Sequence, residues 1–145
     1  MEPIRWDGNK LVLLDQRELP NKIRYVTCNN VDDVYNAIKK MIVRGAPAIG
    51  VVAAYGLVLA IKYYKKNKKD SELEYLKKAA KMLASSRPTA INLKWALSRM
   101  IYIAENCASD NLLNLLATEA ESVHSSDLEG NYKMGRIGAK LILPN

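Results

Sequence analysis

APAIGVVAAYGLVLAI, residues 46–61, is the longest apolar stretch of this chain. It is shorter than the roughly 20 residues that a membrane-spanning helix needs, and a group of lysines follows it. The stretch therefore predicts a helix in a protein core, from about Pro47 to Tyr64. Gly50 and Gly56 interrupt it with minimal side chains, which would let neighbouring helices approach its backbone closely.

The residues before this helix carry a β pattern. Three short β-compatible runs occupy residues 4–6, 10–14 and 23–28, and turn signals separate them at Asp7-Gly8 and Pro20-Asn21. Short strands joined by such turns predict a small antiparallel sheet. A helical pattern with Asn30 as its N-cap then runs to about Ile42.

Helical periodicity continues after the central stretch. Further helices are predicted over residues 72–85, from the break at 86–89 to about Asn106, from a cap at Asp110, and over 127–143 despite three glycines. The fold class is α+β, mainly α: a three-stranded N-terminal sheet and a bundle of five or six helices. Residues 1–28 form the sheet, and residues 29–145 form the helical part of the same domain. No strand alternates with the helices, so a doubly wound parallel sheet is not expected.

Composition excludes several functional classes. The 145 residues are 49% hydrophobic and 26% charged, which is typical of a folded globular domain. Cys28 and Cys107 lack a C-x-x-C partner or a nearby histidine, so neither a disulfide framework nor a metal site is expected, and both are interpreted as packing residues. His124, the single histidine, lies in a polar segment and is assigned to the surface. The first residues lack the apolar core of a signal peptide, which favours a cytoplasmic protein.

The segment Arg44-Gly45-Ala46-Pro47 is the first candidate site. Proline suits the first turn of a helix because it has no N–H to leave unpaired, and Gly45 can adopt a positive φ. The helix start presents free N–H groups and the positive end of the helix dipole, to which Arg44 adds a bidentate cation. The segment predicts a phosphate or carboxylate site. A tight turn with a solvated Arg44 is the alternative.

The segment Ser86-Arg87-Pro88-Thr89 repeats this construction. Pro88 is predicted to open the next helix, with Ser86 or Thr89 as its cap. If the two helix starts converge, Arg44 and Arg87 could bind one anion together. Asn92 is assigned to a hydrogen bond in the cap region, with a ligand contact as the alternative.

The net charge of +7 suggests an anionic partner. Its densest contribution is the lysine cluster, defined as Lys62, Lys65, Lys66, Lys68 and Lys69. Cations near a helix end complement the dipole, and no nucleic-acid-binding motif accompanies them. We therefore interpret the cluster as a solvated helix end rather than a nucleic-acid site.

Several segments, in order along nearly the whole chain, resemble the S-methyl-5-thioribose-1-phosphate isomerase family. They are LDQRELP (14–20), MIV (41–43), RGAPAIG (44–50), SRPTAINL (86–93) and WALSRM (95–100). The resemblance implies an aldose–ketose isomerisation of methylthioribose 1-phosphate in methionine salvage, without a metal or organic cofactor. It places substrate-binding residues at Arg44, Gly45, Ala46 and Arg87.

The resemblance also implies what lies elsewhere. The family's catalytic Cys and Asp belong to a Rossmann-like second domain and would lie beyond Asn145, so no residue of this chain is assigned a catalytic role. The chain is expected to be inactive alone and to act with that domain, in a protein that forms homodimers. The alternative is a non-catalytic regulatory or binding module, akin to the translation-initiation exchange-factor subunits of the same superfamily. Those relatives generally lack the RGAPAIG form.

Overall fold

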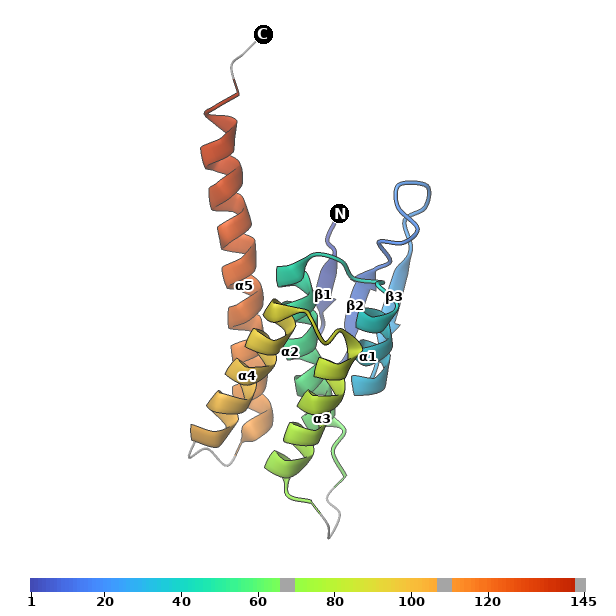
Figure 1. Cartoon of the computed structure of the whole chain (residues 1–145), viewed down its shortest axis with the longest axis vertical. Helices are drawn as coiled ribbons and strands as arrows, with labels where there is room; N and C mark the ends of the chain where they lie inside the picture. Colours follow the sequence, from blue (N-terminus) through green and yellow to red (C-terminus); the bar gives the residue numbers. More distant parts are fainter. Residues whose placement is uncertain (66–69, 107–110, 143–145) are drawn as a thin grey trace.

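A computed structural model describes residues 1–65, 70–106 and 111–142 of the chain. Three strands come first: β1 (Ile4–Trp6), β2 (Leu11–Leu14) and β3 (Tyr25–Cys28). They form one antiparallel sheet in the order β1-β2-β3. Five helices follow: α1 (Val31–Lys39), α2 (Ala46–Lys62), α3 (Glu72–Ser86), α4 (Ile91–Asn106) and α5 (Leu112–Ala139) (Figure 1). The predicted fold class, α+β and mainly α, is confirmed.

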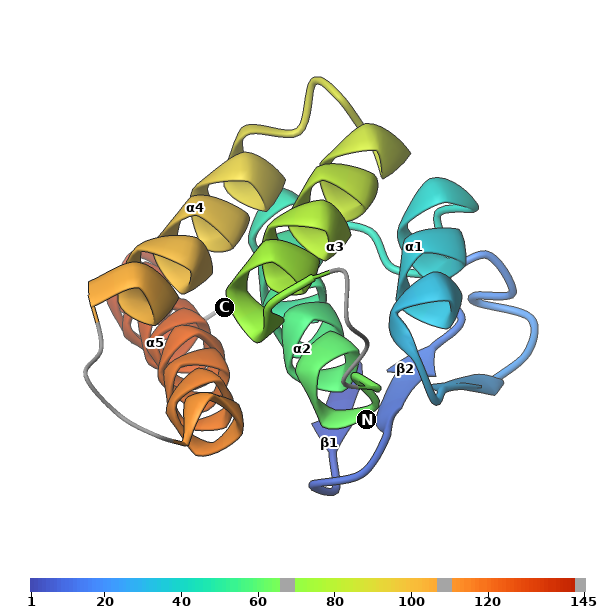
Figure 2. The ribbon, with the colours of Figure 1, turned by 90° about the horizontal axis from the view of Figure 1, so that it is seen from below.

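Helix α2 is the centre of the molecule. Every residue from Ile49 to Ile61 is buried, and α2 contacts all four other helices and β1. Figure 2 shows α3 and α4 on one side of α2 and the strands on the other. The prediction of a buried core helix is confirmed, and no described helix combines the length and apolarity that crossing a membrane requires.

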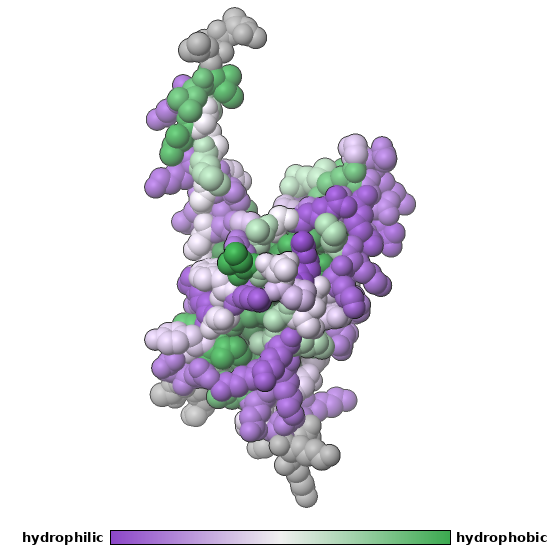
Figure 3. Space-filling view, in the orientation of Figure 1, coloured by the Kyte–Doolittle hydropathy of each residue, from purple (hydrophilic) through white to green (hydrophobic). Residues whose placement is uncertain are grey.

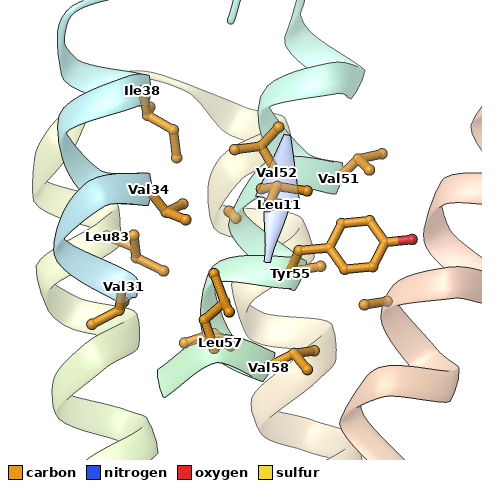
Figure 4. Packing of buried hydrophobic residues seen from close by; sticks show 14 of the residues in the cluster. Leu11, Val31, Val34, Ile38, Val51, Val52, Tyr55, Leu57, Val58 and Leu83 are labelled. Carbon is orange, nitrogen blue, oxygen red and sulfur yellow. The ribbon is translucent and has the colours of Figure 1, made fainter. Parts of the chain in front are cut away.

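Two glycines of α2 explain how closely its neighbours approach. A Cβ added at Gly56 would lie 2.8 Å from Val34 Cγ1 of α1 and 3.2 Å from a methyl of Leu83 in α3. A Cβ at Gly50 would lie 2.9 Å from the carbonyl oxygen of Asn92 in α4. Real Cβ atoms do not come that close to other heavy atoms, so larger residues would push these helices apart. Figure 4 shows the side chains of Val34 and Leu83 directed toward α2.

Alternate residues of β2 pack the sheet into the core. Leu11 and Leu13 of β2 are fully buried, and their register partners include Cys28 and Ile4. Burial, assisted by the charge of Asp33, raises the pKa of the Cys28 thiol to about 12. A thiol that stays protonated at neutral pH is a poor nucleophile, so the interpretation of Cys28 as a packing residue is confirmed. Cys107 lies outside the described residues.

Polar side chains cap three of the helices. Asn30 accepts from the Asp33 N–H at 2.9 Å, as predicted. Ser71 and Glu74 form a reciprocal capping box at the start of α3. Helix α5 is capped by Asn111, which accepts from the Asn114 N–H at 3.0 Å. The predicted cap, Asp110, lies outside the described residues.

One expectation about a helix boundary is wrong, and one alternative that the sequence left open is decided. Helix α1 ends at Lys39 rather than Ile42, because Met41 adopts a φ of 58° and closes the helix. Of the predicted five or six helices, the structure has five in its described residues, because the predicted helical segment from residue 127 continues α5 without a break. Gly130, Gly135 and Gly138 face open space in the half of α5 that projects past the body of the molecule (Figure 1). Glycine weakens a helix by roughly 1 kcal/mol relative to alanine, and no proline lies there to stop it.

The assignment of His124 to the surface is also wrong. His124 is half-buried, and its Nδ1 lies 3.1 Å from the hydroxyl of the buried Tyr55, with which it hydrogen bonds. Trp6 stacks on the ring of Tyr55, with ring centroids 5.0 Å apart. The histidine therefore joins α5 to α2.

Candidate functional site

The start of α2 is an open helix N-terminus. Gly45 is its N-cap with a φ of 96°, and no side chain caps the helix. The first backbone bond runs from the Ile49 N–H to the Gly45 carbonyl, so the N–H groups of Ala46 and Ala48 have no intrahelical acceptor. The first turn carries no acidic residue, and Gly45, Ala46 and Pro47 are exposed. These features leave the positive end of the α2 dipole available to an anion.

Arg44 lies directly before this helix start. Its side chain is exposed, and within the described residues it forms no ion pair. The backbone on its N-terminal side is fixed, because Ile42 and Val43 are buried and the Gln16 N–H donates to the Ile42 carbonyl at 2.9 Å. An unpaired guanidinium thus stands on an anchored segment.

The loop that contacts this segment is itself braced by a buried carboxylate. Asp15 is fully buried and receives two hydrogen bonds from the Arg17 guanidinium, at 2.8 and 2.7 Å. Hydrogen bonding to Arg17 lowers the pKa of Asp15. The charged pair fixes the loop after β2, and the Gln16 N–H of that loop bonds the segment that leads to Arg44.

Arg87 lies in a different local structure from the predicted one. Pro88 does not open α4, which begins three residues later at Ile91. The Ala90 N–H donates to the Arg87 carbonyl at 3.0 Å, so Pro88 occupies the second position of a four-residue turn, where its fixed φ is favoured. Ser86 belongs to α3 and donates to the Leu83 carbonyl instead of capping α4. Arg87 is half-buried and forms no ion pair among the described residues.

The two arginine-bearing segments lie at the same end of the helix bundle. Gly50 of α2 lies against the Asn92 carbonyl of α4, which would be 2.9 Å from a Cβ at Gly50, so the two helices approach closely near their starts. Both helices begin at the upper end in Figure 1, below an opening between the projecting half of α5 and the loop joining β2 to β3 (Figure 3). The predicted residues Arg44, Gly45 and Ala46 are contiguous there, and Arg87 precedes α4 at that end.

A pocket of about 210 Å³ adjoins the start of α2. Its lining comes from Pro47 and Gly50 of α2, Asn92 and Trp95 of α4, and Ser126 and Asp127 of α5. Asn92 is one of the lining residues, and its side chain forms no hydrogen bond within the described residues, so its predicted cap-region hydrogen bond is not formed.

The remaining candidates lie away from this end. Lys62 of the lysine cluster donates to the Gly8 carbonyl at 2.6 Å and to Asn9 Oδ1 at 2.5 Å, which ties the end of α2 to the turn between β1 and β2. Lys66, Lys68 and Lys69 lie outside the described residues. In the part of the chain that the structure describes, no three His, Cys, Asp or Glu side chains gather as metal ligands.

The model of the initiation factor 2 subunit family matches residues 42–144, which include both arginine-bearing segments and the pocket. The chain belongs to the initiation factor 2 subunit family.

The chain is 47% identical over 140 residues to the methylthioribose-1-phosphate isomerase of Thermotoga maritima. The matched region covers 96% of this chain and 40% of that relative. The chain is also 45% identical over 146 residues to the enzyme of the same name from Pelotomaculum thermopropionicum, with 98% and 40% covered. The chain thus spans about 40% of the length of the curated relatives it matches. The resemblance to the isomerase family is confirmed.

Solved structures share the fold. A 5-methylthioribose 1-phosphate isomerase from Pyrococcus horikoshii matches with a TM-score of 0.89 and 36% identity, over 98% of this chain and 40% of that one. A translation initiation factor eIF-2B subunit delta from A. fulgidus matches with a TM-score of 0.88 and 42% identity, over 98% and 42%. The fold is therefore common to proteins that carry both names.

Sequence reasoning about this family member missed Trp95, Ser126 and Asp127 as pocket residues. For Trp95, the apolar pattern of the predicted helix could have indicated such a role. Leu93, Ala96, Leu97 and Met100 form the buried face of α4, whereas Trp95 falls outside that pattern and is 52% exposed. A large aromatic residue on the open face of a helix indicates a contact outside the core. Nothing in the sequence pattern distinguishes Ser126 and Asp127, because only the packing of α5 against α2 places them in the pocket.

Proposed function

We propose that this chain is the N-terminal portion of a methylthioribose-1-phosphate isomerase and that it binds the phosphate of the substrate. The observation that carries the proposal is the uncapped, exposed start of α2, with Gly45 at a φ of 96° and, before it, an exposed Arg44 that forms no ion pair with any described residue. The names of the sequence relatives support the substrate class.

The proposed roles follow from the chemistry of a phosphate dianion. The N–H groups of Ala46 and Ala48 donate to its oxygens, and Gly45 gives them room to approach the backbone. Arg44, which precedes α2, and Arg87, which precedes α4, add charge-assisted hydrogen bonds to the phosphate. The groups that move hydrogen between C1 and C2 of the sugar are expected in the part of the relatives that this chain does not span.

A non-catalytic regulatory or binding module is the second candidate. The match to the structure named as an eIF-2B subunit favours it. The two candidates differ at the open start of α2, because a module that only assembles with other proteins needs no phosphate site.

The experiment is a chimera in which this chain replaces the matching segment of the T. maritima isomerase. We expect the chimera to isomerise methylthioribose 1-phosphate, whereas this chain alone does not. In the chimera, Arg44→Ala or Arg87→Ala should weaken substrate binding by roughly 10- to 150-fold, since a hydrogen bond to a charged group contributes about 1.5–3 kcal/mol. Arg→Lys should restore part of the loss, because lysine lacks the planar fork.

Lys65→Ala is the charge-matched control, because Lys65 is exposed beyond the opposite end of α2. It should leave binding unchanged. A folded chimera without isomerase activity would favour the regulatory module. Loss of binding in Arg44→Ala but not in Arg87→Ala would restrict the phosphate site to the start of α2.

The proposal carries three finer expectations. Residues 1–28 and 29–145 act as one domain that docks against a catalytic domain. The complete protein is a cytoplasmic homodimer. Nucleic acid is not a partner, so the chain should show no sequence-selective affinity for an oligonucleotide at physiological salt.

A further inference from the structure

The pocket between α2, α4 and α5 begins where the phosphate site ends. Pro47, the residue after Ala46, lines it. A ligand whose phosphate sits on the Ala46 N–H therefore has its remaining atoms at the mouth of this pocket. In a 5-methylthioribose 1-phosphate, the phosphate and the methylthio group are attached at opposite ends of the ribose. With C1 at the mouth, the 5-substituent is the part that reaches inward.

The inner surface of the pocket suits an apolar group. Val51 and Val123 line it and are only 1% and 5% exposed. Trp95 closes one side, and the Arg99 guanidinium carbon lies 5.4 Å from the centre of its ring. Arg99 is in turn paired with Glu119 of α5. The indole is thus held in place before any ligand arrives, which reduces the entropy lost on binding.

The polar groups of the pocket suit an uncharged sugar. Within the described residues, neither the Asn92 amide nor the Ser126 hydroxyl is hydrogen bonded as a side chain, so both are free to bind sugar hydroxyls. Asp127 adds a carboxylate, whose single hydrogen bond from another described side chain is a long one of 3.4 Å from Asn131. A negative charge here repels a second phosphate at the 5-position but tolerates a thioether.

We propose that this pocket binds the uncharged 5-substituent of the sugar 1-phosphate, with Trp95 as its apolar wall and Asp127 as the group that rejects a 5-phosphate. The assignment rests on the proposed function. It explains how an α2 start that accepts any phosphate could belong to an enzyme selective for one sugar phosphate.

The test uses the chimera described above. Trp95→Ala should raise the KM for methylthioribose 1-phosphate by about tenfold or more, the discrimination that small apolar groups provide, and Trp95→Phe should restore most of it. Inhibition by inorganic phosphate should not change, since phosphate occupies only the α2 start. Tyr102→Ala is the matched control, because Tyr102 is an exposed aromatic residue of α4 outside this pocket.

Asp127→Asn tests selectivity. Removing the carboxylate should tighten inhibition by ribose 1,5-bisphosphate at least about tenfold, because the variant no longer brings two like charges together. The KM for methylthioribose 1-phosphate should change less than the inhibition constant of the bisphosphate does, because the thioether carries no charge. An active chimera in which neither Trp95→Ala nor Asp127→Asn changes these constants overturns the pocket assignment and leaves the proposed function standing.

A second measurement tests the pocket assignment if the chimera fails to fold or is inactive. In the full chain with Trp6→Phe, Trp95 is the sole tryptophan, and its fluorescence reports directly on the pocket. Titration with 5-methylthioribose should shift the emission, and ribose 5-phosphate should not. No response to 5-methylthioribose at millimolar concentration, or an equal response to both sugars, overturns the assignment.

Discussion

Gly45 links the shape of the backbone to the chemistry of the site. Its φ of 96° is strained for any residue with a Cβ, and the N–H groups it exposes are the proposed phosphate donors. Gly45→Ala should lower the free energy of unfolding by about 1 kcal/mol or more, measured by urea denaturation. In the chimera it should also weaken binding of the substrate.

Gly8→Ala separates these two effects. Gly8 has a similar φ of 87° and no atom within 4 Å of its added Cβ, but it lies in the turn between β1 and β2. It should lose comparable stability and retain full substrate binding. If Gly8→Ala weakened substrate binding as much as Gly45→Ala does, the loss would come from general destabilisation rather than from the α2 start.

His124 makes stability depend on pH. Burial lowers its pKa below the ordinary 6.5, although the charges of Glu2 and Asp127 oppose the shift. The unfolded chain therefore binds a proton at a higher pH than the folded chain does, and the stabilisation, fully present above pH 6.5, is lost as pH falls through the folded pKa. Urea denaturation should show lower stability at pH 5 than at pH 7.5, and His124→Gln should flatten this difference. An unchanged pH dependence in the variant would assign the effect to carboxylates.

The end of α1 shows how one residue sets an element boundary. Met41 takes the left-handed position with a φ of 58°, its N–H donates to the Ile38 carbonyl at 3.1 Å, and the Ile42 N–H donates to the Ala37 carbonyl at 2.9 Å. This is a Schellman motif with methionine where glycine is usual.

The motif gives a prediction opposite in sign to that for Gly45. The Met41 side chain is 42% exposed and loses little on removal, so Met41→Gly should raise the free energy of unfolding by up to about 1 kcal/mol through relief of strain. Thermal denaturation would measure it. A lower melting temperature would mean that the exposed side chain contributes more packing than its accessibility implies.

The sequence patterns predicted most of the helices and strands, and the predictions that were wrong have physical causes. The existence of α4 followed from its apolar period, but its start did not, because Pro88 suits either a helix start or a turn. Only the hydrogen bond from Ala90 to Arg87 distinguishes the two. The glycines of α5 lowered the expectation of a continuous helix, since nothing in the local sequence shows that the remaining helix formers outweigh them.

At the scale of the molecule, the sequence singled out the two arginine-bearing segments, for which phosphate binding stays a prediction, but not the pocket beside them. Arg44 and Gly45 are contiguous, so their chemistry is visible in a single segment. The pocket combines residues from three helices that are distant in sequence, and the contact of Gly50 with the Asn92 carbonyl brings two of them together. Such a contact depends on tertiary packing, which periodicity does not specify.

The two halves of α5 should differ in local stability. Leu116, Ala120 and Val123 are buried, whereas Leu128, Tyr132, Met134 and Ile137 are exposed in the half that projects past the body. A helical segment this short is marginal without tertiary contacts. In this chain, hydrogen exchange should be fast for amides after about Asp127 and slow throughout α2. Equal protection along α5 would show that another surface covers its projecting half.

Because α5 is attached to the body through its first half, a small rotation there moves the far end of the helix much further. At about 1.5 Å per residue, the helix extends roughly 24 Å from Val123, its last buried residue, to Ala139. A pivot of a few degrees at Val123 would carry the tip sideways by a couple of ångströms. The pocket residues Ser126 and Asp127 lie just past that pivot and would scarcely shift. Anything joined to the tip would shift by that amount relative to the start of α2, while the pocket below it kept its shape.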